Sequence, residues 1–293
     1  MKHATQLASP FRDDRPSEEC GVVAVSSPSG EETAQLAFFG LFALQHRGQE
    51  AAGIAVSDGQ RARLHKDVGL LAQIFTPETL APLTGYQAIG HTRYSTMGAS
   101  TARNAQPFLV ETMHGPLALA HNGSLVNATE LRLQLLQRGF ALTAASDTEV
   151  MALMLAAASG RTWEERLERT MPSWKGAYSL VLLGVDCFIA ARDPWGFRPL
   201  SIGRTPEGGW AAASETCALN TLGCTEITEV ENGEIVVVRG KNTTRHRTTT
   251  AANGPARCAF EFVYFSRPDS EWDGRSVHEV RQKLGEQLAI EWP

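Results

Sequence analysis

The chain has few cysteines and no long apolar run, and each shortage argues against a class of protein. Its five cysteines among 293 residues are an odd number without a CxxC pair, which argues against a disulfide framework and favours a cytoplasmic thiol protein. The longest apolar runs, LAFFGLFAL and MALMLAAA, are shorter than the ~18 residues of a membrane span. The formal net charge of −5 provides no basic surface for nucleic acid or an anionic membrane.

Several motifs of well-known sites are also missing. The sequence contains no GxGxxG, no GxxxxGK[ST] and no GxSxG, so nucleotide binding through those loops and a serine-hydrolase elbow have no support. His46, His91 and His121 lack metal-ligand spacing, and structural histidines are the simpler interpretation. No metal site is therefore expected from the histidines.

The order of elements predicts an α+β fold in which helical layers cover antiparallel sheets. Short apolar strands begin at Cys20, cluster again between 51 and 67, and return from Gly176 onward between Gly, Pro and Asp turns. Helices are expected at 32–47, 127–138, from Ser146 through MALMLAAA, at 162–171 and at 276–292.

Local signals refine these boundaries. Asn127 with Glu130, and Ser146 with Glu149, have the spacing of helix capping boxes. Residues 240–257 are polar and are expected to form a loop or linker, whereas CAFEFVYFSRPDS has a strand pattern.

Cys20 is the first candidate for chemistry. It follows a charged, proline-containing leader, residues 1–19, that has no secretory signal. An N-terminal cysteine combines a thiol nucleophile with an α-amino base whose pKa is about 8. The alternative is a buried structural thiol, which is the common fate of a cysteine.

The segment HNGS, which follows an apolar run, is the second candidate. Asn122 offers an amide donor and Gly123 an unhindered backbone N–H, which together could stabilise a tetrahedral oxyanion. The alternative is an NG hairpin turn.

Three charged residues complete the candidate set. Arg93, beside a glycine-bearing loop, could hold a carboxylate, or it could be a surface arginine. Asp147 could bind an ammonium group or serve only the helix dipole. Arg47 could position the site or cap the preceding helix.

Taken together, these segments resemble the amidophosphoribosyltransferase family, whose members transfer glutamine nitrogen in the first step of purine biosynthesis. The matching segments extend from Cys20 to the end of the chain, and they include EECGVVAV, LQHRGQEAAGIAVSDG, IGHTRYSTMGAS, LALAHNGSLVNATELR, RDPWGFRPL, SETCAL and FEFVYFSRPDS.

The resemblance implies an Ntn-hydrolase fold, a four-layer αββα sandwich with two antiparallel sheets. It implies that residues 1–19 are removed and that Cys20 then attacks the glutamine carboxamide. Asn122 and Gly123 match the family's oxyanion hole. Arg93 and Asp147 match the residues that hold the α-carboxylate and the ammonium of glutamine, and the resemblance adds Arg47 and Thr96 as further candidates for glutamine binding.

The sequence departs from the family in one respect. The phosphoribosyltransferase signature of paired acidic residues and a phosphate loop is missing, so 20–250 is expected to be a glutaminase domain and 258–293 the truncated start of a transferase domain. The glutaminase needs no cofactor. Mg²⁺, an iron–sulfur cluster and homo-oligomerisation belong to the full-length family, and Cys258 is a weak match to one cluster ligand.

Two alternatives remain open at this point. The chain could be the glutaminase domain of another class II amidotransferase, such as one that feeds a sugar-phosphate isomerase, although FEFVYFSRPDS argues against it. It could also be an inactive fragment that serves as a binding or assembly module, because the apolar side of 258–293 would then need a partner.

Overall fold

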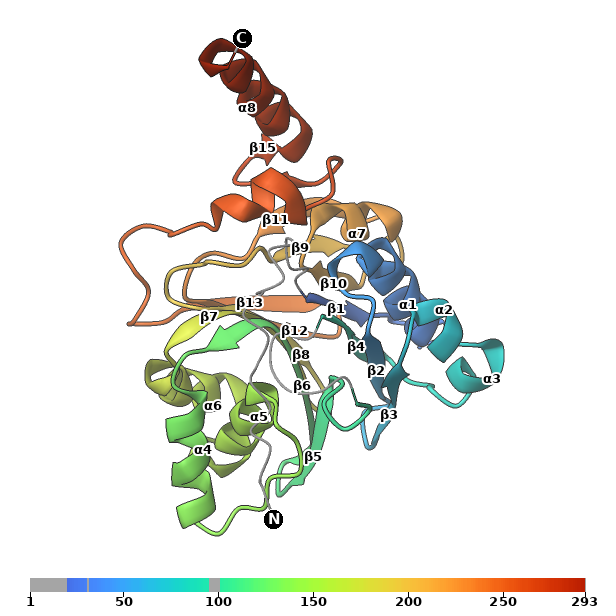
Figure 1. Cartoon of the computed structure of the whole chain (residues 1–293). Coiled ribbons are helices and arrows are strands. Elements are labelled where there is room, and N and C mark those ends of the chain that lie inside the picture. The colour runs from blue at the N-terminus through green and yellow to red at the C-terminus, as the bar shows by residue number, and fades with distance from the viewer. Residues whose placement is uncertain (1–19, 31, 95–100, 293) are drawn as a thin grey trace, which may run out of the picture.

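Two antiparallel sheets lie face to face at the centre of the molecule (Figure 1). The computed structural model describes residues 20–30, 32–94 and 101–292. The leader, 1–19, and Thr96 lie outside the described residues, so the predictions made for them remain predictions.

Sheet A has seven strands in the order β11-β9-β10-β1-β4-β2-β3. Its strands are β1 (Gly21–Ser26), β2 (Ala51–Ser57), β3 (Ala62–Val68), β4 (Gln87–Arg93), β9 (Ser201–Arg204), β10 (Trp210–Ala213) and β11 (Thr225–Glu229). The central strand β1 is apolar almost throughout because both of its faces are covered. Val23 and Val25 face the helices, whereas Val22 and Ala24 face the other sheet.

Sheet B has six strands in the order β13-β12-β8-β7-β6-β5. They are β5 (Phe108–Thr112), β6 (Gly115–Leu125), β7 (Gly176–Leu183), β8 (Phe188–Arg192), β12 (Glu234–Arg239) and β13 (Asn242–Arg247). Alternate residues of β12 also face two cores, because Val236 and Val238 meet sheet A while Ile235 and Val237 meet the helices.

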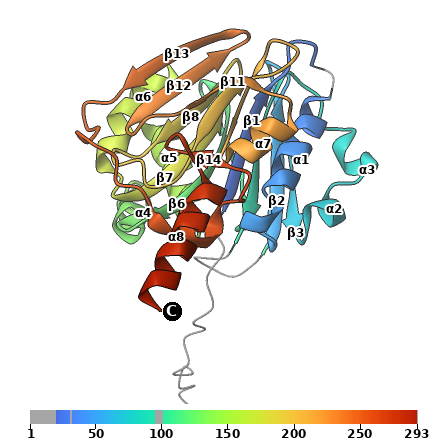
Figure 2. The same ribbon diagram turned by 90° about the horizontal axis from the view of Figure 1, so that it is seen from above.

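Helices cover the outer face of each sheet and complete an αββα sandwich (Figure 2). Sheet A carries α1 (Thr33–Ala43), α2 (Leu71–Ile74), α3 (Pro77–Leu80) and α7 (Thr216–Thr221), and sheet B carries α4 (Ala128–Gln137), α5 (Asp147–Ala157) and α6 (Trp163–Thr170). The predicted α+β, four-layer fold is confirmed. A 3₁₀ turn, Gln45–Arg47, follows α1, so the helix expected over 32–47 ends earlier than predicted.

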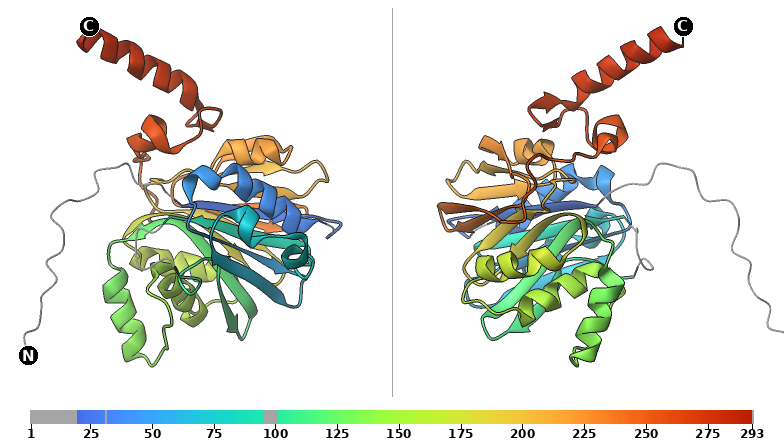
Figure 3. Two further views of the ribbon diagram at one scale, coloured as in Figure 1. Left: turned by 45° about the vertical axis from the view of Figure 1, so that its right-hand side comes forward. Right: turned by 90° about the vertical axis from the view of Figure 1, so that its left-hand side faces the viewer.

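The C-terminal part extends away from the sandwich (Figure 3). It contains a π-helix (Glu261–Phe265), the short hairpin β14 (Glu271–Trp272) and β15 (Arg275–Ser276), and α8 (Val277–Glu291). The large apolar side chains of α8, including Leu284 and Leu288, are exposed. None of the described helices is long and apolar enough to cross a membrane.

Two secondary-structure predictions are wrong. The supposed loop at 240–257 contains β13, which pairs with β12 along its whole length. Because β13 is an exposed edge strand, it needs no apolar side chains and gave no hydrophobic signal. The supposed strand in CAFEFVYFSRPDS is the π-helix, whose aromatic rings pack on one another while Glu261 turns inward.

The capping predictions are partly correct. Ser146 caps α5 by accepting a hydrogen bond from the Thr148 N–H at 3.2 Å, as expected. Glu149, however, accepts from the N–H groups of Thr143 and Ala144 instead of closing the box. Asn127 stands at the start of α4 without a side-chain cap, because its amide instead joins Ser173 and Lys175.

Candidate active site

Cys20 lies immediately before β1, in the middle of sheet A. It is 8% exposed, and its Sγ lies 3.6 Å from the carbonyl oxygen of Tyr94. Gly21 pairs with Thr92 on β4, so the antiparallel register carries Cys20 toward Arg93. The thiol is therefore at the end of a central strand, next to the end of its neighbour.

Arg93 is the last residue of β4, and its side chain is buried. The alternative of an exposed surface arginine is therefore wrong. Its carbonyl accepts a hydrogen bond from the Glu50 N–H at 3.1 Å. Gly48 permits this close approach, since a Cβ there would lie 2.6 Å from the Arg93 carbonyl carbon.

Arg47 lies next to the backbone of Cys20, and its guanidinium is fully buried. Its Nε donates to the Cys20 carbonyl at 3.1 Å, and its two terminal nitrogens bind the carboxylates of Glu215 and Glu261. These bonds favour the positioning role over helix capping. They also occupy the groups that a direct contact to a substrate would need.

Asn122 and Gly123 lie within the long strand β6, so the alternative of an NG hairpin turn is wrong. The side-chain amide of Asn122 is completely buried, and neither of its polar atoms has a hydrogen-bond partner within 20–30, 32–94 and 101–292. Gly123 has φ of 139°, and a Cβ there would lie 2.0 Å from the Ala177 carbonyl oxygen. Only glycine fits, and the neighbouring amide is left with unused hydrogen-bonding capacity.

Asp147 begins α5 behind this strand. Its Oδ2 accepts the Leu125 N–H at 3.0 Å and lies 3.5 Å from the Nε2 of His121. Burial opposes ionisation, but His121 and the Leu125 N–H outweigh it and lower the pKa of Asp147 below its ordinary value. Asp147 is therefore an anion at neutral pH, and its contacts go beyond a simple interaction with the helix dipole.

The histidines join neighbouring parts of the site. His121 Nδ1 lies 2.9 Å from the Thr148 hydroxyl, which ties β6 to α5. Burial first, and then the nearby His121 and Arg93, lower the pKa of His91 well below its ordinary value. His46 instead contacts Glu215, with Nε2 2.7 Å from a carboxylate oxygen.

The candidate residues thus form two walls. Wall A is defined as Cys20, Arg93 and Arg47 on sheet A, and wall B as Asn122, Gly123 and Asp147 on sheet B and α5. Strands β1 and β4 pack against β6 across the interface between the sheets, and His91 of β4 is electrostatically coupled to both Arg93 and His121. A nucleophile, a cation, an anion and oxyanion donors are what acyl transfer on a zwitterionic substrate requires.

Cys258 lies in the C-terminal part, where its carbonyl accepts a hydrogen bond from the Glu261 N–H at 3.2 Å. An Arg198 terminal nitrogen lies 3.8 Å from its Sγ. Among the described residues no group of three or more His, Cys, Asp or Glu side chains could hold a metal ion. In contrast, burial raises the pKa of Cys187 and Cys217 to about 12 and that of Cys224 to about 11, which makes them poor nucleophiles.

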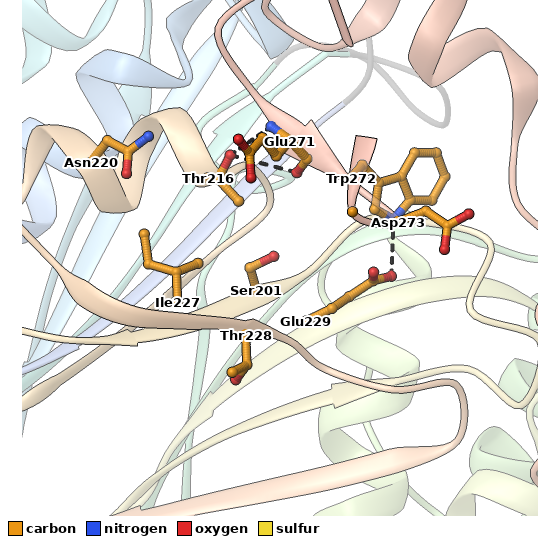
Figure 4. A pocket seen from close by; sticks show the side chains of 10 residues that line it. Ser201, Thr216, Asn220, Ile227, Thr228, Glu229, Glu271, Trp272 and Asp273 are labelled. Carbon is orange, nitrogen blue, oxygen red and sulfur yellow. Dashed lines mark hydrogen bonds between the residues drawn. The ribbon is translucent and has the colours of Figure 1, made fainter. Parts of the chain in front are cut away.

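A cavity of about 320 Å³ lies elsewhere, between β9, β11 and the β14–β15 hairpin (Figure 4). The indole N–H of Trp272 donates to Glu229 at 3.0 Å across it, and the Thr216 hydroxyl accepts from the Glu271 N–H at 2.8 Å. None of the residues predicted from the sequence lines it. Its polar groups are largely joined to one another, which favours a structural hollow.

Comparison with known proteins agrees with this geometry. A family model described as a glutamine amidotransferase domain matches residues 91–221. Amidophosphoribosyltransferase of Synechococcus elongatus is 46% identical over 287 residues, and that of Methanocaldococcus jannaschii is 42% identical over 290. These alignments cover 96% and 94% of this chain, and 58% and 61% of the relatives.

A solved structure extends the match to three dimensions. Glutamine phosphoribosylpyrophosphate amidotransferase from B. subtilis, complexed with ADP and GMP, superposes with a TM-score of 0.85 at 40% identity, over 93% of this chain and 58% of that one. The chain belongs with the glutamine amidotransferase part of the amidophosphoribosyltransferases. The two antiparallel sheets are accordingly those of an Ntn-hydrolase amidotransferase domain, and the chain spans somewhat more than half the length of these relatives.

Sequence reasoning missed two residues that hold Arg47, Glu215 and Glu261. Glu261 stands inside the aromatic run FEFVYF, yet its side chain is completely buried. A charged residue within an apolar run is a signal for a buried ion pair, and it could have identified Glu261 from the sequence. Its partner could not have been identified in the same way, because Arg47 lies 214 residues away.

Proposed function

We propose that this chain hydrolyses glutamine to glutamate and ammonia through a thioester on Cys20. The observation that carries this proposal is the buried, unpartnered amide of Asn122, in the part of the chain that the structure describes, beside the glycine-only position 123. Leaving a buried amide without a hydrogen-bond partner is costly in free energy, so we infer that a bound ligand supplies the missing partner.

The first half of the reaction uses both walls. The Cys20 thiol transfers its proton to its own α-amino group as sulfur bonds to the carboxamide carbon. The amide of Asn122 and the N–H of Gly123 donate to the resulting oxyanion. The carbon–nitrogen bond then breaks, and the α-ammonium returns the proton to the departing ammonia.

The second half releases the product. Water loses a proton to the α-amino group and attacks the thioester, and the Cys20 thiolate leaves with that proton as glutamate departs. Because the α-amino group of Cys20 is the base, the mechanism requires that residues 1–19 be removed.

Charge on the two walls orients glutamine. Arg93 holds its α-carboxylate through a paired hydrogen bond, and Asp147 holds its ammonium. Asp147 uses Oδ2 for the Leu125 N–H, so Oδ1 is the oxygen assigned to the substrate. Thr96 is proposed as a further contact, whereas the bonds of Arg47 assign it to positioning Cys20.

The names of the relatives support a proposal for the fate of the ammonia. We propose that it displaces pyrophosphate from phosphoribosyl pyrophosphate in a Mg²⁺-dependent transferase domain, as the first step of purine biosynthesis. The glutaminase domain is assigned to 20–250 and the start of the transferase domain to 258–293, so this chain performs the glutaminase half-reaction.

The test is release of glutamate from glutamine by the purified chain, with its N-terminus defined by intact mass. Cys20→Ala is expected to lower kcat about a thousandfold or more, because it removes the nucleophile. The matched variant Cys258→Ala is expected to retain activity. A Cys20→Ala variant as active as the wild type would contradict the mechanism, and an inactive wild type that begins at Cys20 would favour the binding-module alternative.

A further inference from the structure

A buried ion network connects Cys20 to the C-terminal part of the chain. Arg47 makes four hydrogen bonds, of which one goes to the Cys20 carbonyl at 3.1 Å and one to Glu215 at 2.6 Å. The other two go to both oxygens of Glu261, at 3.0 and 2.7 Å. Through Arg47, the distant residues Glu215 and Glu261 are therefore connected to the carbonyl group of the proposed nucleophile.

The network is isolated from solvent and joins one cation to two carboxylates. The side chains of Arg47, Glu215 and Glu261 are at most 1% exposed. Burial works against the charge on Arg47, but the two carboxylates raise its pKa above the usual value. Burial likewise works against the charge on Glu215, but Arg47 and His46 lower its pKa. Arg47 and Glu215 are thus ionised.

Glu261 is held from its own side of the network as well. The Ser266 hydroxyl donates to one of its oxygens at 2.8 Å, and a terminal nitrogen of Arg198 lies 3.6 Å from the other. Arg281 of α8 donates to the carbonyls of Phe262 and Ser266, both at 2.7 Å. The Glu261 carboxylate is therefore held in place by the π-helix and α8, independently of its bonds to Arg47.

Glu215 has a different set of partners. Besides Arg47, its carboxylate accepts hydrogen bonds from the Ser270 hydroxyl at 2.6 Å and the Arg267 N–H at 2.8 Å. It therefore anchors the C-terminal segment to α7, whereas Glu261 sets the plane of the guanidinium by binding both terminal nitrogens. Since the Nε–H lies in that plane, its direction toward Cys20 is set with it.

We propose that Glu261 is a positioning residue for Cys20, which it holds in attacking geometry through Arg47. The inference rests on the proposed glutaminase and extends it to a residue outside the glutaminase range 20–250. A misplacement of about 1 Å costs roughly a hundredfold in rate, so a small rotation of Arg47 is sufficient to matter.

The experiment compares Glu261→Gln with the wild type and with Glu286→Gln, which makes the same change on the exposed surface of α8. Two reagents are mapped onto the cysteines by mass spectrometry: a glutamine analogue with a side-chain electrophile, and iodoacetamide. In Glu261→Gln, analogue labelling of Cys20 is expected to fall about tenfold, because it requires attacking geometry. Iodoacetamide alkylation of Cys20 is expected to rise about threefold, because a loosened residue is more accessible.

The other buried cysteines separate this effect from unfolding. Unfolding would expose Cys217 and Cys224 to iodoacetamide as well, and their labelling is expected to stay at the wild-type level. Glu261→Asp, which keeps the charge, is expected to recover part of the analogue labelling, and kcat for glutamine is expected to fall more than KM rises.

Two outcomes would overturn the inference. Wild-type rates with both reagents in Glu261→Gln would show that Glu261 does not position Cys20, and parallel changes at all buried cysteines would assign it a purely structural role. If the wild type itself does not react with the analogue, the proposed function fails, while iodoacetamide alkylation of Cys20 still shows whether Glu261 holds it.

Discussion

Walls A and B differ in how completely their polar groups are paired. On wall A, Arg47 makes its hydrogen bonds to the Cys20 carbonyl and two carboxylates, all of them buried. On wall B, both polar atoms of the Asn122 amide are buried without a partner among residues 20–30, 32–94 and 101–292. The Arg47 network is thus paired within the protein, whereas the Asn122 amide has hydrogen-bonding capacity to spare.

This difference in pairing has different consequences for stability and for catalysis. A saturated buried network contributes to the fold and fixes the nucleophile, and breaking it leaves an uncompensated charge. An unpartnered donor costs stability and gains its partner only when charge develops on a substrate. Substitutions in the Arg47 network should therefore reduce the free energy of unfolding, and substitution of Asn122 should reduce kcat.

The largest expected effect is on the buried ion network around Arg47 of wall A. Glu215→Ala leaves Arg47 with one carboxylate and removes the anchor of Ser270, so the free energy of unfolding should fall by about 3–5 kcal/mol. Urea denaturation monitored by fluorescence would measure it, with the exposed Glu111→Ala as the matched control. A loss below about 1 kcal/mol would mean that the network behaves like a surface salt bridge.

The next largest effect should appear on wall B, in the rate of catalysis instead of in stability. Asn122→Ala is expected to lower kcat for glutamine about 10²–10³-fold, because one oxyanion donor is lost. Its stability should be unchanged or slightly higher, since the amide makes no hydrogen bond to the described residues. Steady-state kinetics and a melting curve test both statements, with the exposed Asn220→Ala as control. If Asn122→Ala melts well below the wild type, the two walls do not differ as described.

The smallest effect concerns pH. Because the folded state lowers the pKa of Asp147 below its ordinary 3.8, Asp147 contributes stability above pH 4, and that contribution is lost as pH falls through the folded value. Asp147→Asn should be less stable than the wild type by about 1.5–3 kcal/mol at pH 7, and the gap should close below about pH 4. Urea titrations from pH 3 to 8 would show this, and a gap independent of pH would contradict it.

The fold and wall B could be predicted largely from the sequence. Apolar strands beginning at Cys20 and Gly176, and the cap at Ser146, are local signals, and the structure confirms them. The role of Asn122 could be proposed because the two oxyanion donors are adjacent in sequence, in HNGS. The residues of wall B come from one short segment, HNGS, and from the start of α5.

The ion network behind wall A could not be predicted in the same way. Arg47, Glu215 and Glu261 come from three distant segments, and only the tertiary structure shows that they meet. Strand β13 was missed because an exposed edge strand requires no apolar pattern, and the π-helix because its aromatic residues imitate a strand. Long-range ion pairs and edge elements leave little trace in a single sequence.

Covalent labelling of the purified chain, beginning at Cys20, tests the central claim most directly. A glutamine analogue with a side-chain electrophile would be applied at low excess, and the five cysteines mapped by mass spectrometry, with glutamine present as a competitor. We predict one label per chain on Cys20, suppressed by glutamine. Labelling distributed over several cysteines, or concentrated on Cys258, would contradict the assignment of Cys20 as the activated nucleophile.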